Sequence, residues 1–212
     1  MSSAESIPHH PLINTALLLI DIQEGLNHPT YWGLNRSNPA FESNIVKLLD
    51  AFRAAQPESP NIFHVCHHSV LPSSPLHPST PGVNFMSCAM PKGNEPVYSK
   101  TVNNPFVETC LAEDLEKKGI KTLYICGLTT NHCVDTTVRM ASNQHVVGNY
   151  EGNRDGGRLV LIGDATAAFD GKGVFDADTI MNVHVESLKG EFCEVLGTNE
   201  VVDCLERLAK EI

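Results

Sequence analysis

The chain has 212 residues, of which 42% are hydrophobic and 19% are charged, and its formal net charge is −10. This length fits one large domain that needs no disulfide or metal to stabilise its core, and the composition excludes a disordered chain and a coiled coil. The acidic balance predicts no nucleic-acid partner and no membrane partner, because both polyanionic surfaces select clustered Lys and Arg.

Compartment signals point to the cytoplasm. The longest apolar run, residues 16–20, is too short to cross a bilayer, and residues 1–10 lack the pattern of a secretory signal. The seven cysteines form no CxxC pair, so neither a disulfide scaffold nor a zinc ribbon is expected. We therefore expect a cytoplasmic protein with reduced thiols.

Short apolar runs alternate with stretches of helical period along the chain. The first half predicts a strand at 16–20, a polar loop at 27–39, a helix at 40–55, a strand at 62–66, a proline-rich loop at 69–95 and a strand at 96–100. The second half predicts a helix that begins at Asn104 and Pro105 and ends at Gly119, a strand at 122–126, a helix at 130–141, a turn at 149–157, a strand at 159–162, a helix at 177–188, a strand at 192–196 and a helix at 200–210.

About six repeats of strand and helix predict an α/β fold. Its expected form is a three-layer α/β/α, Rossmann-like, doubly wound and mainly parallel sheet of about six strands, in a single domain over residues 1–212. Residues 149–157 are glycine-rich, but they contain neither GxGxxG nor GxxxxGK[ST]. A phosphate-binding loop is therefore not expected there.

Three residues whose side chains could act in catalysis follow predicted strands. Asp21 comes after the first strand, Lys100 ends the third, and Cys133 lies just past the fourth. Ligands of open α/β sheets bind outside the carboxyl ends of strands, so the three side chains are expected to converge on one crevice. Taken singly, each has a structural interpretation: a turn-forming Asp, a solvated Lys and a small buried Cys.

Cys133 has a further feature, because it lies in the first turn of a predicted helix. The backbone N–H groups and the positive end of the helix dipole there favour thiolate over thiol, and a nearby Lys100 would add to that effect. The same N–H groups could receive a developing oxyanion.

Five segments resemble the isochorismatase-like cysteine hydrolase superfamily. They are LLLIDIQ at 17–23, VCHHSVLPSSPLHPSTPG at 65–82, YSKTVNNPF at 98–106, CGLTTNHCVDTTVRMA at 126–141 and IGDATAAFD at 162–170. The similarity runs over about residues 15–201. Five motifs in the right order are much more specific than any one of them.

The resemblance implies a hydrolase with a catalytic triad of Asp21, Lys100 and Cys133. It also implies a cis peptide between Leu128 and Thr129, with an oxyanion hole built from the backbone N–H groups of Thr129 and Cys133. In the implied acyl transfer, Asp21 takes the thiol proton, Lys100 stabilises the thiolate, and Cys133 attacks a carbonyl. Family members are typically homodimers or homotetramers, and some leave the cell without a signal peptide.

No cofactor and no metal are expected. The related nicotinamidases bind a metal through an Asp-x-His pair and a further His, whereas this chain has CHHS at 66–69. The histidines of that region are His64, His67, His68 and His77. Without the Asp-x-His pair, we expect these imidazoles to be structural or to line the pocket.

The substrate is expected to be a small molecule. Trp32 is either a packing anchor or an apolar wall for a planar substrate. Weaker substrate-binding candidates, chosen on position alone, are Gln23, His68, Asn84, Phe85, Asn104 and Phe175.

Three functions compete at this point. The first is hydrolysis of a C–N bond in a small amide, imide or carbamoyl compound through a thioester. The second is isochorismate hydrolysis, a vinyl-ether cleavage in which an Asp acid suffices, and the presence of Cys133 favours the first over it. The third is a non-catalytic small-molecule-binding or nucleotide-binding module.

Overall fold

One parallel sheet organises the molecule. The computed structural model describes residues 10–148, 156–171 and 173–210. Its strands are β1 (Thr15–Ile20), β2 (Ile62–His67), β3 (Val97–Lys100), β4 (Thr122–Leu128), β5 (Arg158–Ala167) and β6 (Glu194–Leu196). They lie in the order β3-β2-β1-β4-β5-β6, and every neighbouring pair is parallel. The sheet predicted from the sequence is confirmed.

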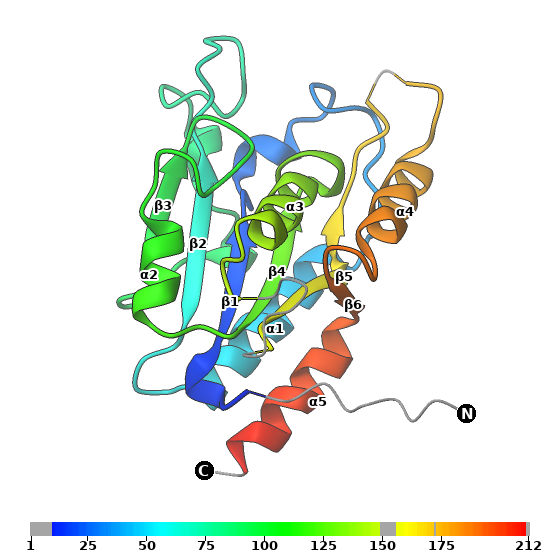
Figure 1. Ribbon diagram of the computed structural model, residues 1–212. Helices are drawn as coiled ribbons and strands as arrows, with labels where there is room; N and C mark the ends of the chain where they lie inside the picture. Colours follow the sequence, from blue (N-terminus) through cyan, green and yellow to red (C-terminus); the bar gives the residue numbers. More distant parts are fainter. Residues whose placement is uncertain (1–9, 149–155, 172, 211–212) are drawn as a thin grey trace, which may run out of the picture.

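Helices cover both faces of the sheet (Figure 1). They are α1 (Phe41–Ala55), α2 (Leu111–Lys117), α3 (Asp135–Asn143), α4 (Ala177–Leu188) and α5 (Thr198–Ala209). Short helical turns are η1 (Leu12–Asn14), η2 (Glu24–Asn27), η3 (Pro81–Val83), η4 (Ser87–Ala89) and the π-helical η5 (Thr130–Val134). None of the helices in the described ranges is long and apolar enough to span a membrane.

The side chains of β1 alternate between the two faces of the sheet, and each face has its own hydrophobic core. Leu17 and Leu19 pack with α1 and α5 on one face, whereas Leu18 and Ile20 pack with α2 and α3 on the other. All six residues of β1 are buried, as expected for a strand covered on both faces. Burial on both faces explains why this segment is a continuous apolar run.

The strand order creates a crevice between β1 and β4. The chain moves outward from β1 through β2 to β3, and then returns to the other side of β1 to form β4. At such a reversal the connections leave in opposite directions, which opens a ligand-binding crevice at the carboxyl ends of the two strands. Ile20 and Gly127 are paired at this end of the sheet.

Several helix boundaries differ from those predicted, and the helix predicted at 130–141 is α-helical only from Asp135, after the π-helical η5. The helix expected to begin at Asn104 begins at Leu111, because the Asn104 side chain accepts a hydrogen bond from the Phe106 N–H and Glu108 adopts a φ of +63°. A residue in the left-handed region cannot continue an α-helix. The last helix begins at Thr198 instead of residue 200, because Asp164 accepts hydrogen bonds from the N–H and hydroxyl of Thr198.

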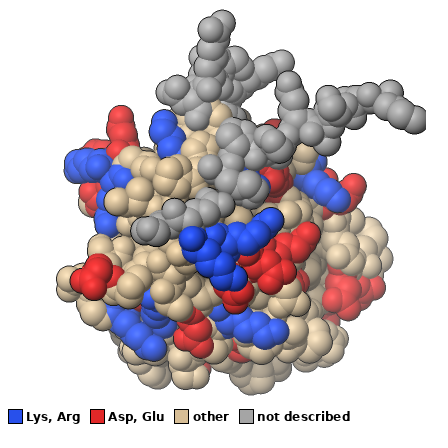
Figure 2. All heavy atoms as spheres, turned by 90° about the horizontal axis from the view of Figure 1, so that it is seen from below, with Lys and Arg blue, Asp and Glu red and all other residues tan. Residues whose placement is uncertain are grey.

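Charges are mixed on the face seen from below (Figure 2). Among the described residues in that view, Lys and Arg side chains lie directly beside Asp and Glu side chains. Most of the turn predicted at 149–157 lies outside the described residues.

Candidate active site

Asp21 follows β1 at the mouth of the crevice. Its backbone adopts a φ of +51°, and its N–H donates to the Val65 carbonyl at 2.9 Å. Asp is one of the few side chains that tolerate this region of φ. The turn buries the carboxylate, whose side chain is only 3% exposed.

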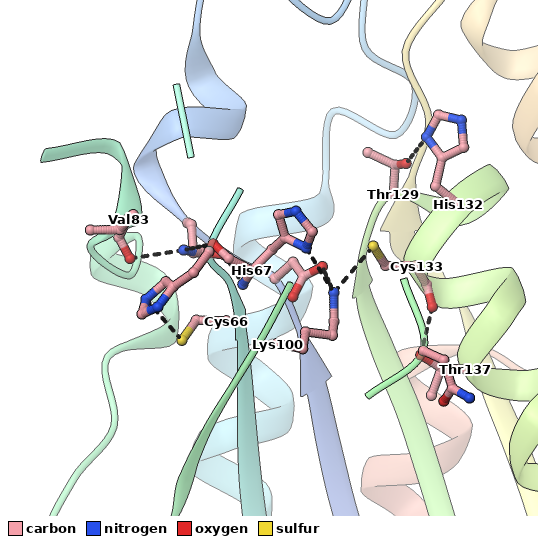
Figure 3. A network of polar contacts seen from close by, with 12 residues as sticks. Cys66, His67, Val83, Lys100, Thr129, His132, Cys133 and Thr137 are labelled. Carbon is pink, nitrogen blue, oxygen red and sulfur yellow. Dashed lines mark hydrogen bonds and ion pairs between the residues drawn. The ribbon is translucent and has the colours of Figure 1, made fainter. Parts of the chain in front are cut away.

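Lys100 reaches this carboxylate from the end of β3. Its side chain is fully buried, and its Nζ lies 2.6 Å from Asp21 Oδ2, 3.3 Å from Cys133 Sγ and 3.4 Å from His67 Nδ1 (Figure 3). Burial by itself would lower the pKa of Lys100, but the charge of Asp21 and the hydrogen bonds of Asp21 and Cys133 outweigh it and raise the pKa. Lys100 is therefore a permanent ammonium with one N–H for each of three acceptors.

Cys133 lies in η5, directly after β4, and its side chain faces Lys100. Burial and the Asp21 carboxylate raise the pKa of the Cys133 thiol, and Lys100 only partly offsets them. The sequence predicts the opposite shift, because it shows the helix start and the lysine but not the buried carboxylate. The resting group is a thiol beside a base.

The segment between β4 and Cys133 contains the expected cis peptide, between Leu128 and Thr129. Thr129 is buried, and its hydroxyl lies 3.3 Å from His132 Nδ1. Leu128 and Thr129 line the same cavity as Cys133.

Gln23 has a supporting position. Its Oε1 accepts from the His67 N–H at 2.7 Å, and its Nε2 donates to the carbonyls of His67 at 3.2 Å and Val83 at 2.9 Å. The buried amide thus fixes the end of β2 and with it the His67 ring. We expected Gln23 to bind substrate, but it holds backbone instead.

A cavity of about 260 Å³ opens beside Asp21 and Cys133. Its walls are Asp21, Leu26, Trp32, His67, Leu76, Asn103, Leu128, Thr129, His132 and Cys133. Trp32 donates its indole N–H to the Gly25 carbonyl at 2.8 Å, so its ring serves as a wall and is also anchored.

The remaining substrate-binding candidates do not line this cavity. His68, Asn84 and Phe85 border a separate cavity beside β3. Asn104 turns to the Phe106 backbone, and Phe175 is 64% exposed before α4.

Four further residues line the cavity that no sequence pattern indicated, namely Leu26, Leu76, Asn103 and His132, and His67 was indicated only as one of four histidines. The adjacency of His132 to Cys133 was the one available signal. The other contacts depend on how loops fold back over the sheet.

Asp21, His67 and Cys133 offer potential metal ligand atoms that lie within 4.8 Å of one another. The Lys100 ammonium contacts all three residues. A buried cation already occupies the centre of this ligand set, so the residues present do not fit a metal ion.

Comparisons with known proteins agree with this architecture. The family model for the isochorismatase domain matches residues 15–200. The chain belongs to the isochorismatase family. It is 34% identical to the isochorismatase family protein YrdC of Bacillus subtilis, over 89% of this chain and 94% of YrdC.

Two further relatives extend the comparison. A crystal structure from Chromobacterium violaceum, described as a candidate hydrolase of the isochorismatase family, superposes with a TM-score of 0.80 at 31% identity, covering 94% of this chain and all of that one. The secreted isochorismatase effector Isc1 of Verticillium dahliae is 30% identical over 75% of this chain and 74% of its own length. This isochorismatase-family chain is thus a hydrolase by membership, and its cytoplasmic location stays a prediction.

Proposed function

We propose that this protein hydrolyses a C–N bond of a small amide, imide or carbamoyl compound through a thioester on Cys133. The observation that carries the proposal is the Lys100 ammonium, which contacts both Asp21 Oδ2 and Cys133 Sγ, and these two residues line one cavity. A base, a cation and a thiol in mutual contact are the parts needed for nucleophilic acyl transfer.

The first half of the reaction forms the thioester. The Asp21 carboxylate accepts the thiol proton while Sγ attacks the carbonyl carbon. Lys100 stabilises the developing thiolate, and the backbone N–H groups of Thr129 and Cys133 receive the oxyanion. Asp21 then gives the proton to the nitrogen as the C–N bond breaks, and the amine leaves.

The second half restores the enzyme. Asp21 takes a proton from water as the oxygen attacks the thioester carbonyl. The C–S bond then breaks, the carboxylic acid leaves, and Asp21 returns the proton to Sγ. Because the resting thiol is protonated, this scheme starts from the state that the raised pKa of Cys133 favours.

Vinyl-ether hydrolysis of isochorismate is the second candidate. The relative named as an isochorismatase effector supports it, and a protonated Asp21 could supply the acid. In that reaction Asp21 would be required and Cys133 would not. A non-catalytic or nucleotide-binding module is the weakest candidate, because it leaves the contact of Lys100 with both groups unused.

Turnover by the wild type, Cys133→Ala and Asp21→Asn separates these functions. On the amides that the wild type turns over, we expect both variants to lose at least about 10³-fold in kcat/KM, and the double variant to be little worse, because members of one catalytic unit are not additive. The control is Cys110→Ala, which removes an exposed thiol. Isochorismate turnover that survives Cys133→Ala would favour the second function, and no turnover of any compound would favour the third.

We also propose a homodimer or homotetramer, on the strength of the resemblance. Sedimentation of the full chain checks this, and a monomer at micromolar concentration would contradict it.

A further inference from the structure

We propose that the substrate of this site is an uncharged carboxamide, and that compounds carrying a carboxylate are excluded. This inference rests on the proposed function and narrows its substrate class. It follows from the charges, the free acceptor and the apolar walls of the cavity above Cys133.

The charges of the site cancel without a substrate. Within the described residues, Lys100 is the one Lys or Arg in contact with the reacting groups, and its partner is Asp21 at 2.6 Å. Among the described residues that line the cavity there is neither Lys nor Arg. An incoming carboxylate would thus find no unpaired cation, and it would lie near the buried charge of Asp21.

The two histidines of the cavity do not supply a positive charge. Burial and the neighbouring Lys100 lower the pKa of His67, and burial and His184 lower the pKa of His132. Both imidazoles are therefore neutral at physiological pH. His67 Nδ1 faces an ammonium that can only donate, so this nitrogen is an acceptor.

Asp21 Oδ1 favours a ligand that can donate a hydrogen bond. It is a buried carboxylate oxygen with no partner among the described residues. Leaving such a buried acceptor unpaired is energetically unfavourable. An amide N–H would satisfy it and would also place the nitrogen beside the group that protonates it, whereas a carboxylate offers no donor.

Part of the cavity lining is apolar. Leu26, Leu76, Leu128 and the anchored ring of Trp32 are among the lining residues. A volume of about 260 Å³ equals roughly nine water molecules at ~30 Å³ each. The acyl group of the substrate is therefore compact and apolar.

Two alkylating reagents of nearly equal size test the exclusion of carboxylates, and the test does not require turnover. Iodoacetamide is itself an uncharged carboxamide, and iodoacetate is its anionic counterpart. In both reactions Sγ displaces iodide from the methylene carbon, and the thiol proton is lost to a base. The rates at Cys133 are measured by peptide mass spectrometry at one mildly alkaline pH, in the folded chain and in the urea-unfolded chain.

We expect the ratio of the iodoacetamide rate to the iodoacetate rate at Cys133 to be at least about tenfold higher in the folded chain, since an unpaired charge costs more than one hydrogen bond. Equal ratios in the two states would overturn the proposal. Failure of both reagents to label folded Cys133 would also overturn it, because the cavity would then not admit even a small amide.

A cavity variant sharpens the test. Asn103 is exposed on the rim and has no place in the proposed chemistry. Asn103→Arg should bring the ratio back toward the unfolded value, whereas Asn103→Gln should leave it unchanged. An unchanged ratio in Asn103→Arg would contradict the charge argument.

The two proposals fail separately. Amide turnover that survives Cys133→Ala would refute the thioester mechanism and leave the alkylation ratio as it is. Faster turnover of succinamate than of butyramide, which differ in a carboxylate against a methyl group, would refute the exclusion of carboxylates and leave the mechanism intact.

Discussion

Lys100 Nζ lies 2.6 Å from Asp21 Oδ2, and both side chains are removed from solvent. A buried pair of this kind is costly to break, because the remaining charge has neither water nor a partner. We predict that Lys100→Met lowers the free energy of unfolding by about 3–5 kcal/mol.

The double variant Lys100→Met with Asp21→Asn should recover part of that loss, since it leaves no unpaired charge. Urea unfolding curves of the wild type, the single variants and the double variant measure both effects. A double variant that is less stable than Lys100→Met would contradict this account of the pair.

The raised pKa of Cys133 predicts slow alkylation near neutral pH. The rate should rise with pH toward a midpoint above that of an ordinary thiol, because burial and the Asp21 charge favour the protonated form. Asp21→Asn removes the negative charge and leaves the Lys100 ammonium, so it should shift the midpoint to lower pH and speed alkylation while turnover is lost. A midpoint that does not move in Asp21→Asn would mean that the carboxylate does not act on the thiol.

Gly127 is the point where β4 passes closest to β1. Its φ is +127°, and a Cβ there would overlap the backbone carbonyl of Ile20. We predict that Gly127→Ala lowers the free energy of unfolding by about 3 kcal/mol or more, through both the strained φ and the overlap. Gly93→Ala is the matched control, because it also has a positive φ but meets no atom within 4 Å; its loss should be clearly smaller.

The Glu95 carboxyl group makes the free energy of unfolding depend on pH in the acidic range. Burial would raise its pKa, but hydrogen bonds from Arg53, the Lys92 N–H and His64 lower it below the usual value. A carboxyl whose pKa is depressed by folding stabilises the protein above its unfolded pKa of about 4.3, and that contribution is lost as the pH falls through the folded pKa.

The variant Glu95→Gln should therefore be less stable than the wild type by about 1.5–3 kcal/mol at neutral pH, and the difference should shrink below about pH 4. Urea unfolding curves recorded between pH 3 and 7, at intervals of about one pH unit, measure this dependence. Glu191→Gln, at an exposed position, should change stability little at any pH. A constant difference across this range would contradict the assignment to charge.

The alternation of apolar strands and amphipathic helices was sufficient to predict a parallel α/β sheet, because burial on one or two faces leaves a period in the sequence. The positions of Asp21, Lys100 and Cys133 after three strands predicted their convergence for a similar reason. Parallel strands bring their carboxyl ends to one edge.

Tertiary structure decided what the sequence could not. The pKa of Cys133 depends on burial and on the carboxylate of Asp21, which lies 112 positions away along the chain. These two effects raise the pKa, whereas the helix start and Lys100 alone would lower it. The cavity walls Leu76 and Asn103 come from loops whose folding over the sheet leaves no periodic signal, and Gln23 turned to the β2 backbone instead of the cavity. Local patterns encode which face a residue buries, whereas contacts between distant loops and the electrostatics of a desolvated site arise only when the chain is folded.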